Sequence, residues 1–268
     1  MNKIIGFIGC GNMGQAMIGG IIKAKIVSPA NIVVADLNEK SLAETEVKYG
    51  VKVTKDNKAA AENSDILILS VKPNLYPVII KEIKDKIKED LVVVTIAAGK
   101  SINGTEEQFG RKIKVVRVMP NTPALVGEGM AALCPNDAVT KEELEEIKNI
   151  FESFGKSEVV SENLMDVVTS VSGSSPAYVY MFIEAMADAA VLDGMPRNQA
   201  YKFAAQAVLG AAKMVIETGM HPGALKDMVC SPGGTTIEAV ATLEEKGLRD
   251  AVISAMRSCT KKSIEMSK

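Results

Sequence analysis

The sequence predicts an α/β fold, in which a doubly wound, mainly parallel sheet is followed by an all-helical region. Residues 1–160 alternate short β-branched runs with charged helical stretches, and no further β-branched run appears after about residue 164. The short runs are apolar almost throughout, as in parallel strands that are covered on both faces. With 268 residues, 47% hydrophobic and 24% charged, the chain is long and apolar enough for two modest domains.

The strands and helices of the first region alternate in chain order. Strands are expected at residues 4–8, 32–35, 66–70, 92–96 and 115–118, and a final pair at 130–133 and 158–160 is expected to extend the sheet. Helices are expected between them at residues 39–49, 75–88 and 142–154. This βαβ rhythm predicts ligand binding at the carboxyl ends of the strands.

The second region is expected to be helical, with helices at residues 176–193, 196–218, 223–229, 236–245 and 248–266. Segment 176–193 carries only Glu184 and Asp188 before its last residue, so nearly its whole circumference is expected to be buried. A helical region of this kind often hides one face against another chain. The sequence therefore predicts two domains, residues 1–163 and residues 164–268, the second of which dimerises.

The composition argues against several classes of function. The 31 basic and 33 acidic residues give a net charge of −2, and neither half is basic, so nucleic acid is not expected as a partner. Four scattered cysteines indicate a reducing compartment, and a single histidine argues against a transition-metal site. Residues 4–22 are uncharged, but their glycines favour a buried strand and a turn over a membrane helix. A cytoplasmic protein without metal is expected.

The segment Gly-Cys-Gly-Asn-Met-Gly at residues 9–14 fits G-x-G-x-x-G and directly follows the first predicted strand. In this pattern Gly9 permits a tight turn, Gly11 lets a pyrophosphate approach, and Gly14 allows close packing of helix on strand. Backbone N–H groups at the start of the next helix, which runs to about residue 25, would face the phosphates. The pattern predicts a Rossmann-type dinucleotide-binding domain, and the alternative is a plain glycine turn.

Asp36 ends the second predicted strand, where an acid can bind the ribose 2′-OH of the adenosine and so favour NAD. No arginine stands nearby to hold a 2′-phosphate, for which Asn38 and Lys40 are the only candidates. Alternatively, Asp36 caps the following helix. The choice between NADH and NADPH stays open on this evidence.

Further strand ends and two hydroxyl clusters complete the pattern. The strand ends at residues 70–73, 97–99 and 119–121 offer small residues, prolines or an amide where the nicotinamide half would lie. The clusters at residues 172–176 and 231–236 each precede a helix and suit a small carboxylate, although ordinary N-capping is the commoner role. The expectation that neither cap has an acidic side chain nearby favours a substrate anion.

Taken together, these motifs resemble the pyrroline-5-carboxylate reductase family. The resemblance lies in Ser-Pro-Gly-Gly-Thr-Thr-Ile-Glu-Ala-Val at residues 231–240 and in the motifs at residues 8–14, 71–73, 97–99, 119–121 and 172–178, in order along essentially the whole chain. It implies NADPH- or NADH-dependent hydride transfer to the imine carbon of 1-pyrroline-5-carboxylate, giving L-proline in the last step of proline biosynthesis. It also implies a homodimer, which in this family often assembles further into a decamer of five dimers.

The resemblance implies a set of site residues as well. The cofactor site is expected to contain Gly9, Gly11, Asn12, Met13, Asn57, Val71, Lys72, Pro73, Ala97 and Gly99, to which the glycine pattern adds Gly14 and Asp36. The substrate is expected to contact Ser231, Gly234, Thr235 and Thr236, with Ser174 nearby. We hypothesise that Thr236 is catalytic and offers its hydroxyl near the ring nitrogen.

Two other functions fit the two-domain plan. A β-hydroxyacid dehydrogenase usually needs a lysine or another base beside the substrate hydroxyl, and residues 170–183 contain no lysine. A catalytically silent dinucleotide sensor or scaffold would bind the cofactor tightly without turning over any imine or keto acid.

Overall fold

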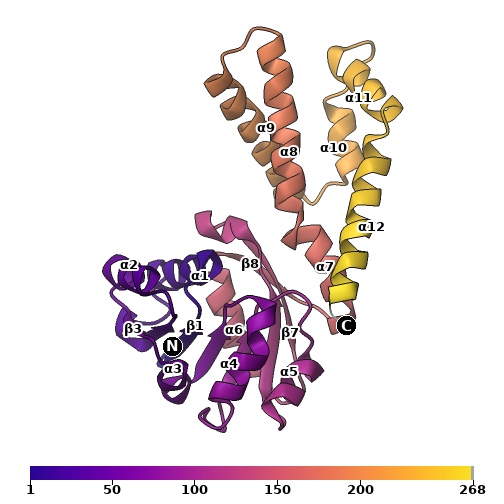
Figure 1. Ribbon diagram of the computed structural model, residues 1–268. Coiled ribbons are helices and arrows are strands. Elements are labelled where there is room, and N and C mark those ends of the chain that lie inside the picture. The colour runs from indigo at the N-terminus through magenta and orange to yellow at the C-terminus, as the bar shows by residue number, and fades with distance from the viewer. Residues whose placement is uncertain (267–268) are drawn as a thin grey trace. The chain divides into compact units, whose positions relative to one another are not determined.

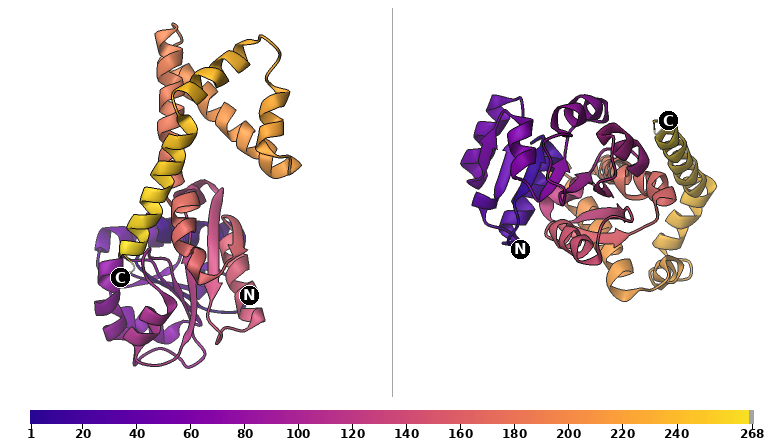
Figure 2. Two further views of the ribbon diagram at one scale, coloured as in Figure 1. Left: turned by 90° about the vertical axis from the view of Figure 1, so that its right-hand side faces the viewer. Right: turned by 90° about the horizontal axis from the view of Figure 1, so that it is seen from below.

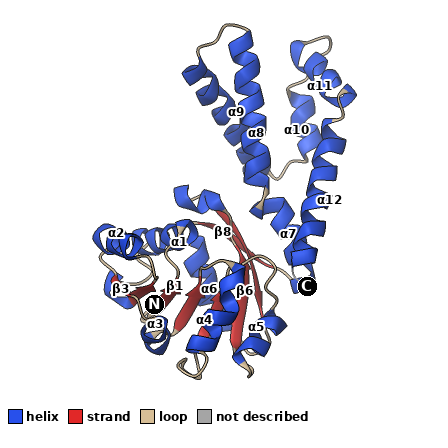
Figure 3. Cartoon of the chain, in the orientation of Figure 1, coloured by secondary structure: helices blue, strands red, loops and turns tan. Residues whose placement is uncertain are grey.

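The computed structural model describes residues 1–266 and consists of two compact units. Unit 1 comprises Met1–Ser174 together with the C-terminal residues from Cys259 onward, and unit 2 comprises Ser175–Ser258. Strands occur only in unit 1, and unit 2 is helical (Figure 3). The predicted division between residues 163 and 164 follows the change from strands to helices in the sequence, whereas the two units follow contacts in space.

Unit 1 is built on one eight-stranded sheet in the order β3-β2-β1-β4-β5-β6-β7-β8. All neighbouring pairs are parallel except β6 and β7, so the predicted final pair does extend the sheet. Because β1 lies between β2 and β4, the strand order reverses direction there, which is where α/β folds bind ligands. The strands are β1 (Ile5–Ile8), β2 (Ile32–Ala35), β3 (Lys52–Thr54), β4 (Ile66–Leu69), β5 (Val92–Thr95), β6 (Lys114–Met119), β7 (Gly129–Pro135) and β8 (Gly155–Val159).

Helices cover both faces of this sheet (Figure 1). Residues of α1, α2 and α6 pack into one hydrophobic cluster, and residues of α3, α4, α5 and α7 pack into a second one. Two buried layers of this kind explain why the central strands are apolar on both faces. The helices are α1 (Asn12–Lys23), α2 (Glu39–Tyr49), α3 (Asn57–Asn63), α4 (Tyr76–Ile83), α5 (Ile102–Phe109), α6 (Lys141–Glu152) and α7 (Met165–Val168).

The sequence did not predict β3, α3, α5 or α7, and it predicted α4 as too long. These four missed elements are short, and β3 is a three-residue edge strand without a buried residue, so none carries a long periodic pattern. The predicted helix 75–88 stops at Ile83, because the chain tightens there: Lys86 N–H donates to the Ile83 carbonyl over three residues at 2.8 Å. These differences do not affect the doubly wound sheet that the sequence predicts.

Unit 2 contains the five predicted helices. Gly194 and Gly219 follow α8 and α9 with φ of +97° and +62°, as expected of helix C-termini. Pro176 lies in the first turn of α8, whereas Pro196 is the N-cap of α9, one residue earlier than predicted. The helices are α8 (Ser175–Leu192), α9 (Arg197–Thr218), α10 (Pro222–Met228), α11 (Thr235–Glu245) and α12 (Leu248–Met266), whose last residues belong to unit 1.

Helix α8 is not buried within a single chain, so that expectation is wrong for the protomer. It packs beside α9 (Figures 1 and 2), but Tyr180 and Met181 are 59% and 70% exposed. Only Ala187 of α8 is buried. Much of the apolar circumference of α8 is therefore left exposed in the single chain, although α9 packs against it. None of the helices in residues 1–266 has the length and apolar character that a membrane span requires.

Candidate functional site

The carboxyl ends of β1 and β4 approach each other closely at Gly9. This residue has φ of +99°, and a Cβ added to it would lie 2.6 Å from the Ser70 carbonyl oxygen. Its N–H donates to the Ala35 carbonyl at the end of β2, at 2.8 Å. Only glycine combines this backbone conformation with so little space. Gly9 thus forms the tight turn at the point where the strand order reverses.

The other two glycines of the loop have opposite surroundings. A Cβ on Gly14 would lie 2.6 Å from the Gly9 carbonyl oxygen, so this residue packs α1 against the loop. A Cβ on Gly11 would meet nothing within 4 Å, and Gly11 caps α1 without a side-chain hydrogen bond. The first turn of α1, with Asn12 and Met13, therefore begins beside open space. Backbone N–H groups and the helix dipole make such an end suitable for a phosphate.

Two hydroxyl groups hold the strand ends around this loop. Sequence analysis placed Ser70 among the strand-end residues but did not single out Tyr76. The Ser70 hydroxyl donates to the Gly9 carbonyl, with the Ile8 carbonyl 3.1 Å away. The buried Tyr76 hydroxyl donates to the Leu69 carbonyl at 2.8 Å, and burial raises its pKa well above the ordinary range, so it stays protonated. In the sequence, the only indication of these hydrogen bonds was that a hydroxyl-bearing side chain follows a buried strand.

Asp36 lies at the end of β2 and faces the glycine loop. Its Oδ2 accepts the Cys10 N–H at 2.8 Å, and its Oδ1 accepts the Asn38 N–H at 2.9 Å. Asn38, not Asp36, caps α2, because its side chain accepts the Ser41 N–H. The alternative of Asp36 as the helix cap is therefore wrong. Burial, followed by the charge of Asp36, raises the pKa of the Cys10 thiol to about 11, so this thiol stays neutral.

The remaining predicted cofactor residues in unit 1 also follow strand ends. Val71, Lys72 and Pro73 come after β4, and Ala97 and Gly99 come after β5, its neighbour. Because these strands are parallel, their carboxyl ends lie on the same edge of the sheet. Lys72 is exposed there, and Gly99 has a positive φ of 72°.

Asn57 opens α3 just after β3, but it is buried. Its Nδ2 donates to Glu82 at 2.9 Å, so at least part of its amide is used inside the protein.

Asn121, at the end of β6, has both ends of its side chain bound to the protein. Its Nδ2 donates to the Ser172 carbonyl at 3.0 Å, and its Oδ1 accepts the Met130 N–H at 2.8 Å. Ser172 belongs to a π-helical turn, Thr169–Gly173, a feature that is frequent at functional sites. The amide expected beside the nicotinamide half is therefore a clamp between β7 and this turn.

The π-helical turn is also held by the end of α12, within unit 1 (Figure 1). Thr260 donates to the Ser170 hydroxyl at 2.9 Å, and the Cys259 thiol donates to the Ser174 hydroxyl at 3.3 Å. The predicted substrate residue Ser174 is thus half-buried and positioned by a cysteine.

In unit 2 the loop before α11 gathers the other predicted substrate residues. Gly234 caps α11 with no side-chain hydrogen bond, and its N–H donates to the Ser231 carbonyl at 3.0 Å. Thr235 and Thr236 open the helix. Ordinary N-capping by a hydroxyl is therefore not what this cluster does. The expectation that no acidic side chain lies nearby is wrong, because Glu238 belongs to the first turn of α11.

Comparisons with known proteins match the whole chain. Residues 162–266 match a family model described as pyrroline-5-carboxylate reductase dimerisation, and residues 4–99 match one described as NADP oxidoreductase coenzyme F420-dependent. The chain is 53% identical over 268 residues to pyrroline-5-carboxylate reductase of Escherichia coli, covering all of both chains.

Two solved structures are similar throughout. A pyrroline-5-carboxylate reductase from Coxiella burnetii is 34% identical, with a TM-score of 0.93 and full coverage of both chains. The Plasmodium falciparum pyrroline carboxylate reductase, solved with NADP bound, is 32% identical with a TM-score of 0.91, covering 100% of this chain and 99% of that one.

Proposed function

Because this chain belongs to the pyrroline-5-carboxylate reductase family, we propose that it reduces the imine bond of 1-pyrroline-5-carboxylate to give L-proline, the last step of proline biosynthesis. The enzyme is an NAD(P)H-dependent oxidoreductase. The observation that carries this function is the full-length match at 53% identity. This match favours neither of the two alternative functions, a β-hydroxyacid dehydrogenase or a catalytically silent dinucleotide sensor or scaffold.

The residues of unit 1 fit a dinucleotide. Open space at Gly11 leaves room for a pyrophosphate, while Gly9 and Gly14 are too crowded for any side chain. We assign the phosphates to Gly11, Asn12 and Met13, and the nicotinamide half to the segments that follow β4 and β5. When bound, the reduced nicotinamide supplies the hydride that the imine carbon accepts.

The residues of the 231–236 loop fit a small carboxylate. Amides at the start of α11 are oriented toward an anion, and the hydroxyls of Ser231 and Thr235 add further donors. In this proposal Thr236 offers its hydroxyl to the ring nitrogen, and Ser174 contributes a second hydroxyl. A protonated imine is already electrophilic, so binding and orientation by these groups can supply much of the rate.

Initial rates of NADH and NADPH oxidation on adding pyrroline-5-carboxylate test the activity. For the assignment of Thr236, we expect Thr236→Ala to lower kcat/KM about tenfold or more, as for loss of a hydrogen bond to a charged group. Thr236→Ser should retain most of the rate. Thr242→Ala, on the same helix but bonded to the Glu238 carbonyl, is the control. An unchanged kcat/KM in Thr236→Ala would remove this residue from the mechanism.

We further propose that the chain works as a homodimer in the cytoplasm, and that five dimers assemble into a decamer. The match of residues 162–266 to a dimerisation region and the exposed apolar side chains of α8 support the dimer. The four cysteines are all unpaired, as in a reducing compartment. Analytical ultracentrifugation separates a dimer from a decamer.

A further inference from the structure

We propose that this chain selects NADH over NADPH, and that the Asp36 carboxylate makes the selection by binding the ribose 2′-hydroxyl of the adenosine. The proposal rests on the dinucleotide site of the proposed function. It assigns to one residue a preference that family membership leaves open, since a relative is solved with NADP bound.

The first argument is the position of the Asp36 carboxylate. The backbone N–H of Asp36 donates to the Thr54 carbonyl at 3.3 Å. The two carboxylate oxygens of Asp36 accept the Cys10 and Asn38 N–H groups at 2.8 and 2.9 Å. The carboxylate is therefore held against the glycine loop, where the adenosine follows a pyrophosphate bound at Gly11. An ionised carboxylate has about four lone-pair sites, so it can still accept from a ribose diol.

The second argument is charge. A 2′-phosphate on the ribose would place a strong negative charge beside the negatively charged carboxylate of Asp36, and the two like charges would repel each other. The Cys10 thiol lies 3.4 Å from Asp36 Oδ2 and donates to it, and residues 9–14 contain no lysine or arginine that would offset the charge. NADH carries only hydroxyls at this position and gains a charge-assisted hydrogen bond instead.

The third argument is that two lysines beside this strand end, Lys55 and Lys40, already have acidic partners. Lys55, which follows β3 next to β2, forms an ion pair with Glu39, and this bond lowers the pKa of Glu39 so that it stays ionised. Lys40 lies 3.9 Å from Glu44. The first arginine in the sequence is Arg111, whose guanidinium faces the Lys84 and Ile87 carbonyls. The bidentate arginine that typically holds a 2′-phosphate therefore has no counterpart here.

Equilibrium binding to the full-length enzyme without imine tests the proposal. The probes are NADH and NADPH, together with ADP-ribose and its 2′-phosphorylated form, which isolate the adenosine half. We expect the Kd of each non-phosphorylated probe to be lower by about tenfold or more. Equal or tighter binding of the phosphorylated probes would overturn the proposal. Since no imine is present, a failure of the reductase activity would not affect this measurement.

Variants of Asp36 locate the preference. Asp36→Asn should weaken NADH binding about tenfold and leave NADPH binding nearly unchanged, and Asp36→Ser should bring the two affinities close together. Glu46→Gln removes the same charge from exposed α2 without touching the Lys40–Glu44 pair and should keep the ratio of the wild type. If Asp36→Asn and Asp36→Ser weaken the binding of both dinucleotides equally, Asp36 only holds the glycine loop in place and does not select the cofactor.

Discussion

Gly11 and Gly14 of the dinucleotide loop differ in what a methyl group would meet. An added Cβ finds open space at Gly11 but lies 2.6 Å from a backbone oxygen at Gly14. The two residues therefore have different roles: Gly11 leaves room for a ligand, and Gly14 permits close packing of α1 against the loop. Substitution by alanine separates these two roles.

We expect Gly14→Ala to lower the free energy of unfolding by about 1–3 kcal/mol, the usual cost of overpacking. Gly11→Ala should leave the free energy of unfolding within about 0.5 kcal/mol of the wild type and weaken dinucleotide binding, because the new methyl group would occupy the space of the pyrophosphate. Urea denaturation and nucleotide titration of both variants check this. A Gly11→Ala variant that binds NADH as tightly as the wild type would contradict the assignment of the phosphates.

Residue identity alone predicted the glycine turn, because positive φ and close approach exclude every other side chain at Gly9. It did not predict the roles of Ser70, Tyr76 and Asn121, whose side chains form hydrogen bonds with backbone groups that lie between 7 and 62 residues away in the sequence. A serine after a strand has many possible partners, and only the folded sheet brings the Gly9 carbonyl within reach of Ser70.

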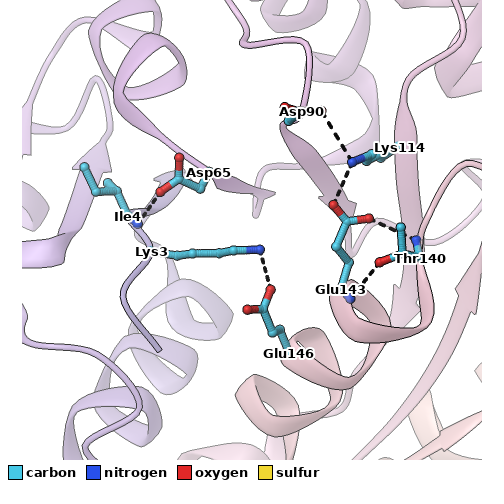
Figure 4. A network of polar contacts seen from close by, with 8 residues as sticks. All are labelled: Lys3, Ile4, Asp65, Asp90, Lys114, Thr140, Glu143 and Glu146. Carbon is cyan, nitrogen blue, oxygen red and sulfur yellow. Dashed lines mark hydrogen bonds and ion pairs between the residues drawn. The ribbon is translucent and has the colours of Figure 1, made fainter.

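At the scale of elements, charged residues connect α6 to the amino ends of the strands, at the end of the sheet opposite the candidate site (Figure 4). Lys3, Asp65, Asp90 and Lys114 lie at the amino ends of four neighbouring parallel strands, and α6 brings acidic residues to them. Lys114 lies 2.7 Å from Glu143 and 3.7 Å from Asp90. The network therefore ties α6 to the strands at the end of the sheet opposite the proposed ligand site.

This network makes stability depend on pH. Burial would raise the pKa of Glu143, but hydrogen bonds from Lys114 and the Thr140 N–H outweigh burial and lower it. A carboxyl whose folded pKa is depressed stabilises the fold above its unfolded pKa of about 4.3, and this contribution is lost as the pH falls through the folded pKa. Glu143→Gln should cost about 1–2 kcal/mol at pH 7, and the difference should shrink as the pH falls below about 4.3.

Glutamine suits this test because it can still accept the Thr140 N–H as the last member of the capping box. Glu145→Gln is the control on the same helix, since its pair with Lys148 is exposed. Thermal denaturation of both variants from pH 3 to pH 8 provides the comparison. A difference for Glu143→Gln that is independent of pH would mean that packing, not charge, is what the substitution removes.

The clamp at Asn121 joins three elements: the end of β6, the start of β7 and the π-helical turn. Asn121→Ala leaves the Met130 N–H and the Ser172 carbonyl without this partner, which should lower the free energy of unfolding by about 1–3 kcal/mol. Asn63→Ala, which removes an exposed amide bonded to the Ala59 carbonyl, should cost no more than about 0.5 kcal/mol. Equal costs measured by urea denaturation would contradict a clamp.

At the scale of the whole molecule, the doubly wound sheet and the change to helices could be predicted because buried parallel strands and long helices have strong patterns. Short α3 and edge strand β3 lack such patterns. The sequence also could not show that the end of α12 returns to unit 1, since this depends on contacts such as that of Ser263 with Asp166, nearly a hundred residues apart.

Unit 2 has more apolar surface than one chain can bury. On α9, Phe203 and Ile216 are 67% and 76% exposed, and an apolar pocket of about 470 Å³ lies among residues such as Leu243 and Ile253. Exposed apolar surface of this extent usually marks an interface between chains. The match of this region to a dimerisation model supports the proposed homodimer, in which a second copy of the chain would cover this surface.

We therefore expect Phe203→Asp to shift the protein toward monomer, because a charge in an apolar interface must be desolvated without a partner. Val47→Asp is the matched control, since Val47 is 88% exposed on α2 of unit 1 and the same change there leaves unit 2 intact. Light scattering after gel filtration, over a range of protein concentrations, measures the masses. A Phe203→Asp variant that keeps the mass of the wild type at every concentration would exclude this face of α9 from the interface, whereas loss of the dimer in both variants would point to a nonspecific effect of added charge.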